Sequence, residues 1–262
     1  SGSFRKDQLF FKPYGSWMIN SLKTFEYFFV QNHSSAELLK EIGFNNVAIS
    51  GDTRFDRVVQ QLKRDNQLDF IEEFKGDKFC LVTGSTWPED ENLLLDFITS
   101  EGSDIKTIIA PHTISRERIK KLQENLKIPS VLFSEKEGKD LSEFPVLILD
   151  TIGLLSRVYY YADVAYVGGA AGKTGLHNIL EPATFGIPII IGKNFKKFPE
   201  AEELQKQAGL FSVATPSELT EVMQKFIQDN DFRSETGIIV GRFIDSNTGA
   251  SQKIAEYFEQ TS

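Results

Sequence analysis

Cysteine and long apolar runs are almost missing from this sequence of 262 residues. Its single cysteine, Cys80, cannot form an intramolecular disulfide, which fits a reducing compartment. Because Cys80 lies in the apolar run 79–82, we expect a small buried core residue rather than a nucleophile. No stretch approaches the roughly 20 apolar residues of a membrane span, and none has the pattern of a signal peptide. We therefore expect this chain itself to be soluble.

The sequence also lacks a block of basic residues. Lys and Arg number 29 against 37 Asp and Glu, which gives a formal net charge of −8. This balance argues against a nucleic-acid partner, although a nucleotide needs only a local positive field. There are three histidines, and no His, Asp and Glu cluster has metal-ligand spacing. We expect no cofactor and assign no metal ligands, and the sequence leaves open whether a metal assists.

What is present is an alternation of short β-branched or aromatic runs with longer amphipathic patterns. Strands are predicted at residues 47–50, 79–83, 107–110, 131–134, 146–149, 164–168, 187–191 and 211–213. Helices are predicted at residues 90–99, 116–126, 154–161, 178–185, 201–207, 217–228, 232–243 and 252–259. Near-continuous apolar strands separated by helices predict an α/β fold with a parallel sheet covered on both faces, followed by a helical C-terminus.

The first 50 residues form a pattern of their own. It comprises a helix around 17–22, a strand at 25–30, a helix at 34–42 that stops at Gly43, and the strand 47–50. Two strands cannot make a stable α/β domain alone. We therefore predict that residues 4–51 are the tail of another domain, 52–76 a linker, and 77–262 the main domain with its terminal helices.

Residues 168–188, GGAAGKTGLHNILEPATFGIP, carry the strongest functional signal. They follow an apolar strand pattern and give a glycine-rich loop, with His177 and Asn178 where a helix should begin. The free amides of a helix N-terminus form an anion site. Glu181, expected in the first turn, can accept hydrogen bonds from the vicinal hydroxyls of a sugar. Phosphate on the amides and ribose on the carboxylate together indicate a nucleotide-sugar site.

A simpler interpretation stays open for this segment. Glycines between a strand and a helix often make only a tight turn, and Asn178 could be a plain N-cap. The spacing of Lys173 and Thr174 does not fit a Walker A loop, and the glycines do not fit a dinucleotide fingerprint. Turn chemistry, however, explains little of the longer run G-x-H-N-x-x-E-P-A-x-x-G-x-P.

That run resembles the donor-nucleotide motif of the 3-deoxy-D-manno-octulosonic acid (Kdo) transferases of lipopolysaccharide synthesis. Other blocks agree with the family in order and spacing. The sequence of 51–56, GDTRFD, is similar to an interdomain motif, and Gly84-Ser-Thr86 with the acidic run 89–91 resembles a donor-domain loop. Residues 150–153, DTIG, with the later Tyr161-Ala-Asp163, resemble a further block.

The resemblance implies a GT-B arrangement, in which two Rossmann-like domains with doubly wound parallel sheets face a cleft. This chain would be the C-terminal, CMP-sugar-binding half, with a remnant of the acceptor domain. The full enzyme would transfer Kdo from CMP-Kdo to lipid A precursor at the cytoplasmic face of the bacterial inner membrane. Membrane contact would be peripheral or made through the missing N-terminus. The family's catalytic base lies near the start of the acceptor domain, so we expect no catalytic residue here.

Truncation of that kind would leave apolar surface around Phe10, Phe11, Trp17 and Phe25, which favours a homo-oligomer.

Because ligands of doubly wound sheets lie beyond the carboxyl ends of the strands, four loops are expected to contact the donor nucleotide. The residues assigned to this site are Ser85, Thr86, Pro111, His112, Ile152, Gly153, Gly169, Thr174, Gly175, His177, Asn178 and Glu181.

Several of these residues have alternative roles. Ser85 and Thr86 could bind phosphate or cap the next helix, and His177 could touch the ligand or fix its own loop. By resemblance, Ile152 and Gly153 would face the pyrimidine. Where the family has P-R-H this chain has Pro111-His112-Thr113, so the family's arginine is missing or displaced to Arg116 or Arg118. The acidic run 89–91 is most simply a favourable first helical turn.

Two other functions remain open from the sequence. One is a UDP-sugar 2-epimerase of the same architecture. The other is a non-catalytic nucleotide-binding module.

Overall fold

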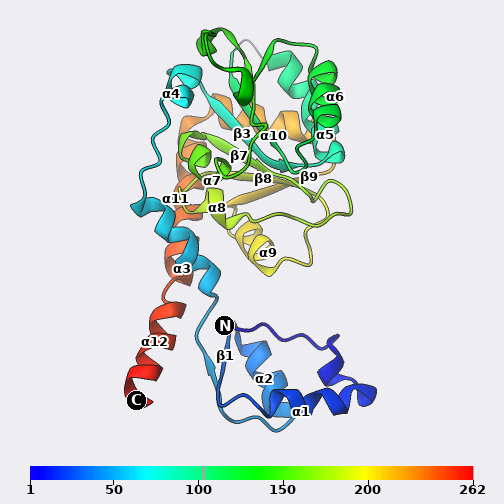
Figure 1. Cartoon of the computed structure of the whole chain (residues 1–262), viewed down its shortest axis with the longest axis vertical. Coiled ribbons are helices and arrows are strands. Elements are labelled where there is room, and N and C mark those ends of the chain that lie inside the picture. The colour runs from blue at the N-terminus through cyan, green and yellow to red at the C-terminus, as the bar shows by residue number, and fades with distance from the viewer. Residues whose placement is uncertain (102–103, 262) are drawn as a thin grey trace. The chain divides into compact units, whose positions relative to one another are not determined.

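The computed structural model describes residues 1–101 and 104–261 of the chain, which forms two compact units. Unit 1 comprises residues 1–60 together with 244–262, and unit 2 comprises residues 61–243. Figure 1 shows the elements of both units along the colour ramp.

Unit 1 contains a two-stranded parallel sheet in which β1 (Phe28–Val30) pairs with β2 (Val47–Ile49). Between these strands runs α2 (His33–Glu41), whose N-cap Asn32 accepts a hydrogen bond from the Ser35 amide. Strand β1 is shorter than the predicted 25–30. The remaining elements of this unit are η1 (Leu9–Phe11), η2 (Pro13–Met18), α1 (Ile19–Leu22), α3 (Thr53–Val59) and α12 (Ala250–Thr261).

The exposed apolar surface predicted for the first residues is present only in part. Trp17 and Phe25 are exposed, at 70% and 57%. Phe10 and Phe11 are half-buried, because each packs edge-on against Phe4. Phe10 also packs against the small core that includes Leu22, Phe28, Val30, Ala36 and Leu39.

Unit 2 is built on a seven-stranded parallel sheet with strand order β5-β6-β4-β3-β7-β8-β9. This confirms the predicted doubly wound parallel fold, and every predicted strand from residue 79 onward is found within a few residues. The strands are β3 (Cys80–Thr86), β4 (Lys106–Pro111), β5 (Ser130–Leu132), β6 (Val146–Ile148), β7 (Val164–Val167), β8 (Ile189–Gly192) and β9 (Leu210–Val213).

Both faces of this sheet are covered, as the continuous apolar strands predict. Along β3, Leu81 packs into one core cluster, while Cys80 and Val82 pack into the other, because alternate strand residues face opposite sides. The first cluster includes residues of α5 (Pro88–Glu101), α6 (Arg116–Leu126) and α10 (Pro216–Gln228). The second includes residues of α4 (Asp69–Lys75) and α7 (Leu155–Val158).

The other elements of unit 2 are short connectors and the C-terminal helices. They are η4 (Phe133–Glu135), η5 (Leu141–Glu143), η6 (Tyr159–Tyr161), α8 (Leu180–Ala183) and α9 (Pro199–Lys206). Helix α11 (Asn230–Asn247) begins in this unit, and η3 (Gln60–Lys63) begins with the last residue of the first part of unit 1 and continues into unit 2.

Residues 52–76, predicted as a linker, contain α3, η3 and α4. Helix α4 is part of the main core, because Ile71 and Phe74 are fully buried in it. Helix α12 groups with unit 1 rather than with residues 77–243. The assignment of 4–51 to the tail of an acceptor domain stays a prediction.

Candidate functional site

The parallel sheet brings the four predicted loops together at the carboxyl ends of its strands, which we call the carboxyl edge of the sheet. All twelve predicted site residues lie at or after the carboxyl ends of β3, β4, β6 and β7, and parallel strands place these ends together. The chain leaves β3 toward β4 on one side, whereas β7 pairs with β3 on the other. The direction of winding therefore reverses between β3 and β7, which is where open α/β sheets bind their ligands.

Strand β3 ends in an irregularity at Ser85. Its pairing with β4 shifts register between Gly84 and Thr86, and Ser85 has a φ of +55°. A left-handed conformation at a non-glycine residue costs about 1–2 kcal/mol, a strain typical of ligand sites. The bulge leaves Ser85 half-buried. Thr86 is fully buried, and its hydroxyl donates to Glu91 Oε1 at 3.0 Å. That hydroxyl is therefore already engaged, and a phosphate contact by Thr86 stays a prediction.

Three rings meet at this edge. Trp87 stacks on His112 with 4.5 Å between ring centroids, and His112 lies 4.5 Å from His177. The Trp87 indole N–H donates to His177 Nε2 at 3.1 Å, and the His177 amide donates to the Gly168 carbonyl. Burial, followed by the neighbouring His112, lowers the pKa of His177. In this arrangement Nε2 of His177 is an acceptor, and the backbone amide of His177 fixes its loop. Trp87, one of two tryptophans, was not identified as a site residue from the sequence.

The acidic run at the start of α5 does more than favour a first helical turn. Glu91 is buried and forms an ion pair with Arg118 at 2.7 Å. Burial raises the pKa of Glu91, despite the opposing effect of Arg118. Arg118 is thus occupied by this carboxylate, whereas Arg116 is exposed. Of the two arginines considered as displaced ligand contacts, only Arg116 is without such an engagement among the described residues.

Asp90, the neighbour of Glu91, lies fully buried beneath the glycine-rich loop. It accepts hydrogen bonds from the amides of Gly169 (2.8 Å) and Ala171 (3.2 Å). The sequence pattern gave no sign of this contact, because it joins residues that are 79 and 81 positions apart.

The glycine-rich loop is closely packed. Gly169 has a φ of +96°, and a Cβ there would lie 2.0 Å from the Gly175 carbonyl oxygen, so only glycine fits. The Thr174 hydroxyl donates to the Gly169 carbonyl at 3.2 Å, which closes the loop on itself. The predicted residues Gly169, Thr174 and Gly175 are therefore together, although the amide of Gly169 is already used by Asp90.

The helix after this loop is shorter than predicted. Residues 178–185 were expected to be helical, but α8 covers only Leu180–Ala183. Asn178 lies before the helix. Its side-chain oxygen accepts from the Leu180 amide at 3.1 Å, and its side-chain nitrogen donates to Glu181 Oε1 at 3.2 Å. Asn178 and Glu181 are thus hydrogen-bonded to each other. The expected anion site at the N-terminus of a longer helix is not formed, because α8 begins only at Leu180.

The loop after β8 adds positive charge beside the glycine-rich loop. The Asn194 side chain donates to the carbonyls of Ala171 (3.3 Å) and Gly172 (2.7 Å), and its amide donates to the Ala170 carbonyl. These bonds tie the two loops together, and both loops carry exposed lysines. The lysines are Lys173, Lys193, Lys196 and Lys197. They supply the local positive field that an acidic chain needs to hold an anion.

The loop after β6 presents an apolar side chain to solvent. Ile152 is 88% exposed, and Gly153 follows with a φ of +90°. Asp150 anchors the start of the loop, since it accepts from the Ser134 amide at 2.9 Å and from the Ser134 hydroxyl at 2.5 Å. An exposed isoleucine on a fixed loop is consistent with the expected contact to a flat base.

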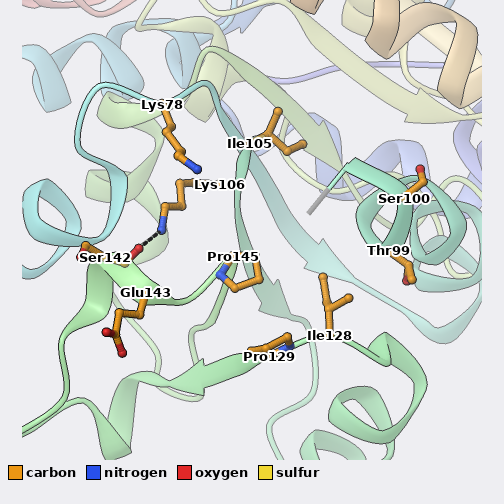
Figure 2. A pocket seen from close by; sticks show the side chains of 10 residues that line it. All are labelled: Lys78, Thr99, Ser100, Ile105, Lys106, Ile128, Pro129, Ser142, Glu143 and Pro145. Carbon is orange, nitrogen blue, oxygen red and sulfur yellow. Dashed lines mark hydrogen bonds between the residues drawn. The ribbon is translucent and has the colours of Figure 1, made fainter. Parts of the chain in front are cut away.

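A cavity of about 350 Å³ lies at the other end of the strands, beside their amino ends (Figure 2). Its lining includes Lys106 at the start of β4 and Pro145 just before β6. Lys106 is buried, and burial lowers the pKa of its side chain. Its Nζ nevertheless has partners, because it donates to the carbonyls of Ser142 (2.6 Å) and Phe144 (2.7 Å). None of the predicted site residues lines this cavity.

Cys80 is buried as predicted, and burial raises the pKa of its thiol to about 12. Within the described residues, no group of three or more His, Cys, Asp or Glu could hold a metal ion. In the same part of the chain, every helix is too short or too polar to cross a membrane.

Comparison with known proteins finds relatives among the Kdo transferases. The chain is 27% identical over 222 residues to 3-deoxy-D-manno-octulosonic acid transferase of Rickettsia bellii, covering 81% of this chain and 51% of the relative. It is 26% identical over 210 residues to the transferase of Aquifex aeolicus, covering 78% and 55%. The chain thus spans about half the length of these curated relatives. No family model matches it.

Solved structures show the same fold. The C-terminal CMP-Kdo binding domain of WaaA from Acinetobacter baumannii has a TM-score of 0.58 at 18% identity, covering 74% of this chain and 99% of that domain. UDP-GlcNAc 2-epimerase from Neisseria meningitidis has a TM-score of 0.66 at 15% identity, covering 98% and 67%. These likenesses describe the GT-B-type architecture. Over most of its length, therefore, this chain is similar in sequence to the Kdo transferases, as its motifs indicate.

Proposed function

We propose that this chain is the donor-binding half of a Kdo transferase, a glycosyltransferase that moves Kdo from CMP-Kdo to lipid A precursor in lipopolysaccharide synthesis. The observation that carries the proposal is the gathering of the family-like motifs at one edge of the sheet. Residues 84–86, 150–153 and 168–181 are far apart in the sequence, yet their loops share the edge where α/β sheets bind nucleotides. Sequence similarity to curated Kdo transferases supports the same function.

Three of the four loops have an assigned role in this proposal. The amides of Thr174 and Gly175, with the adjoining lysines, hold the donor phosphate. Glu181 accepts hydrogen bonds from the ribose hydroxyls. Ile152 and Gly153 contact the cytosine. His112 and His177 border the sugar side of the site, where Nε2 of His177 accepts a hydrogen bond from Trp87. The donor sugar is already activated by its nucleotide, so the proposal includes no further cofactor.

The acceptor and its catalytic base belong to the part of the enzyme that lies outside this chain. A glycosyl transfer requires a base within hydrogen-bond reach of the acceptor hydroxyl. We propose that this base and the lipid A precursor are held by the domain that the relatives carry in addition. Membrane contact, at the cytoplasmic face of the inner membrane, is made by the same part or peripherally.

The test is a calorimetric comparison of ligands on this chain. We expect CMP to bind at millimolar concentration or tighter, and more tightly than UMP, a UDP-sugar or NAD. Cytidine is the matched control for the phosphate, and its weaker binding would assign the difference to the loop amides and lysines. Tighter binding of a UDP-sugar would instead favour a 2-epimerase, and tighter NAD binding would contradict any nucleotide-sugar function.

A further inference from the structure

Asp90 is held in an unusual environment for a carboxylate. It is fully buried in the first turn of α5, and its two oxygens accept four hydrogen bonds. Oδ2 accepts from the amides of Trp87 (2.9 Å) and Gly169 (2.8 Å). Oδ1 accepts from the Tyr166 hydroxyl (2.8 Å) and the Ala171 amide (3.2 Å). Four donors on two oxygens are the full complement of an ionised carboxyl group.

No lysine or arginine among the described residues forms an ion pair with this carboxylate. The nearby arginine, Arg118, pairs with Glu91 instead. Burying a carboxylate without a cation is costly unless hydrogen bonds replace its water, and bonds to a charged acceptor are about twice as strong as neutral ones. Here the compensating donors come from the end of β3, from β7 and from the glycine-rich loop. The hydrogen bonds that stabilise the buried carboxylate therefore also join these three segments at the carboxyl ends of the strands.

Asp90 divides the glycine-rich loop into two halves. In the first half, the amides of Gly169 and Ala171 are directed to Asp90 and so cannot bind a ligand. In the second half, the amides of Gly172, Thr174 and Gly175 have no acceptor among the described residues. The ends of this second half are fixed by Asn194 at Gly172 and by the Thr174 hydroxyl.

The same carboxylate also connects the loop to the stacked rings of Trp87, His112 and His177. Its hydrogen bond to the Trp87 amide fixes the backbone from which the indole stacks on His112 and donates to His177. His177 is in turn bonded to the Gly168 carbonyl through its amide. A displacement at Asp90 therefore reaches the loop by two routes.

We propose that Asp90 is a positioning residue of the donor site. It holds Gly169–Ala171 against the sheet and thereby presents the free amides of Gly172–Gly175 to the monophosphate of the nucleotide. This inference rests on the proposed function, because it assigns how that site is formed. It also predicts that the phosphate approaches the second half of the loop, away from the buried negative charge.

The first measurement uses the unsubstituted chain and amide NMR. We expect the amides of Gly169 and Ala171 to be protected from hydrogen exchange without ligand. Addition of CMP should shift and protect amides in Gly172–Gly175 and leave the exchange of Gly169 and Ala171 nearly unchanged. Fast exchange at Gly169 and Ala171 in the free chain, or their recruitment by CMP, would overturn the proposal.

The second measurement compares two Asp-to-Asn variants by calorimetry and thermal melting. Asp90→Asn should weaken CMP binding by at least about tenfold, because an amide replaces the charged acceptor of two loop amides. Asp163→Asn is the matched control. Asp163 accepts from the Cys80 amide and pairs with Lys75, at the amino end of the same sheet. It should lower the melting temperature without changing CMP affinity.

The outcomes separate the two proposals. If the unsubstituted chain does not bind CMP, the proposed function fails, and the positioning role fails with it. If the chain binds CMP and Asp90→Asn binds it equally well, only the positioning role is overturned. Equal loss of affinity in both variants would also overturn it, since loss of stability alone would then explain the effect. If Asp90→Asn does not fold, the exchange experiment on the unsubstituted chain decides.

Discussion

Glu181 shows what a single residue can contribute to the site. Its side chain is half-buried, and one oxygen accepts from Asn178 at 3.2 Å. We predict that Glu181→Gln weakens CMP binding by about 1–3 kcal/mol, the range for hydrogen bonds to a charged acceptor. Calorimetry measures the affinity, and the melting temperature should change little.

The matched control for this prediction is Glu221→Gln on α10, where the side chain is exposed and distant in sequence from every site loop. It should change neither affinity nor melting temperature. A Glu181→Gln variant that melts earlier but binds CMP normally would show that the carboxylate only supports the turn formed with Asn178.

At the residue scale, the sequence indicated which residues lie in the site loops better than it indicated their contacts. Glycines at 169 and 175 and the neighbouring histidine were recognised, because a long motif marks them. Asp90 and Trp87 were not recognised, because their partners Gly169 and His177 lie 79 and 90 residues further along the chain. Asp90 was marked only as a member of the acidic run 89–91, and Trp87 only by its place after the Ser85-Thr86 pair.

Among the elements, α12 depends on a carboxylate from α3. Asp56 accepts hydrogen bonds from the amide of Gly249 (2.6 Å), just before the helix, and from the amide of Ser251 (2.7 Å), in its first turn. Burial acts to raise the pKa of Asp56, but the hydrogen bonds from this helix start outweigh it and hold the pKa below its ordinary value. Asp56 closes the GDTRFD motif, so part of this motif holds the C-terminal helix.

We predict that this attachment is pH-dependent. A lowered pKa in the folded state means that the stabilisation is complete above the unfolded value of about 3.9. It is lost as the pH falls through the lower folded value. The protection factors of the Gly249 and Ser251 amides, which correct for intrinsic exchange, should therefore be high at neutral pH and should fall only below about pH 4.

Asp56→Asn provides the comparison for this element. It should accelerate exchange at Gly249 and Ser251 at neutral pH and abolish the acid-dependent step. The buried sheet of unit 2 should keep its exchange rates. Identical exchange profiles for the variant and the unsubstituted chain would show that packing alone holds α12.

The short α8 shows why element boundaries were harder to predict than elements. The apolar pattern of 178–185 favours a helix, but Pro182 lies four residues after Asn178. A proline ring clashes with the carbonyl four residues earlier and offers no N–H to it. Proline is tolerated only in a first turn, so the helix begins at Leu180, after Asn178.

For the molecule as a whole, the architecture predicts that this chain alone has no turnover. In the proposed function it supplies the donor loops, and its matched part spans only about half the length of the curated relatives. We expect no Kdo transfer from CMP-Kdo to lipid A precursor by these 262 residues. A chain extended N-terminally by a complete acceptor domain should be active.

Detection of the glycosylated lipid by mass spectrometry provides the measurement, with the extended chain carrying Glu181→Gln as a control of reduced donor binding. Turnover by the unextended chain would contradict the assignment of the base to another domain. It would direct the search to Asp52, Asp56 and Glu89 within this chain.

The sequence by itself determined the order of strands and helices in unit 2, the burial of both sheet faces and the motifs that resemble those of the Kdo transferases. These depend on local patterns: runs of apolar residues, glycines and proline. Only the tertiary structure decided which loop amides are free, which arginine is already paired and which rings stack. Those properties depend on residues distant in sequence, such as Asp90 and Gly169, that meet because parallel strands align their carboxyl ends at one edge of the sheet.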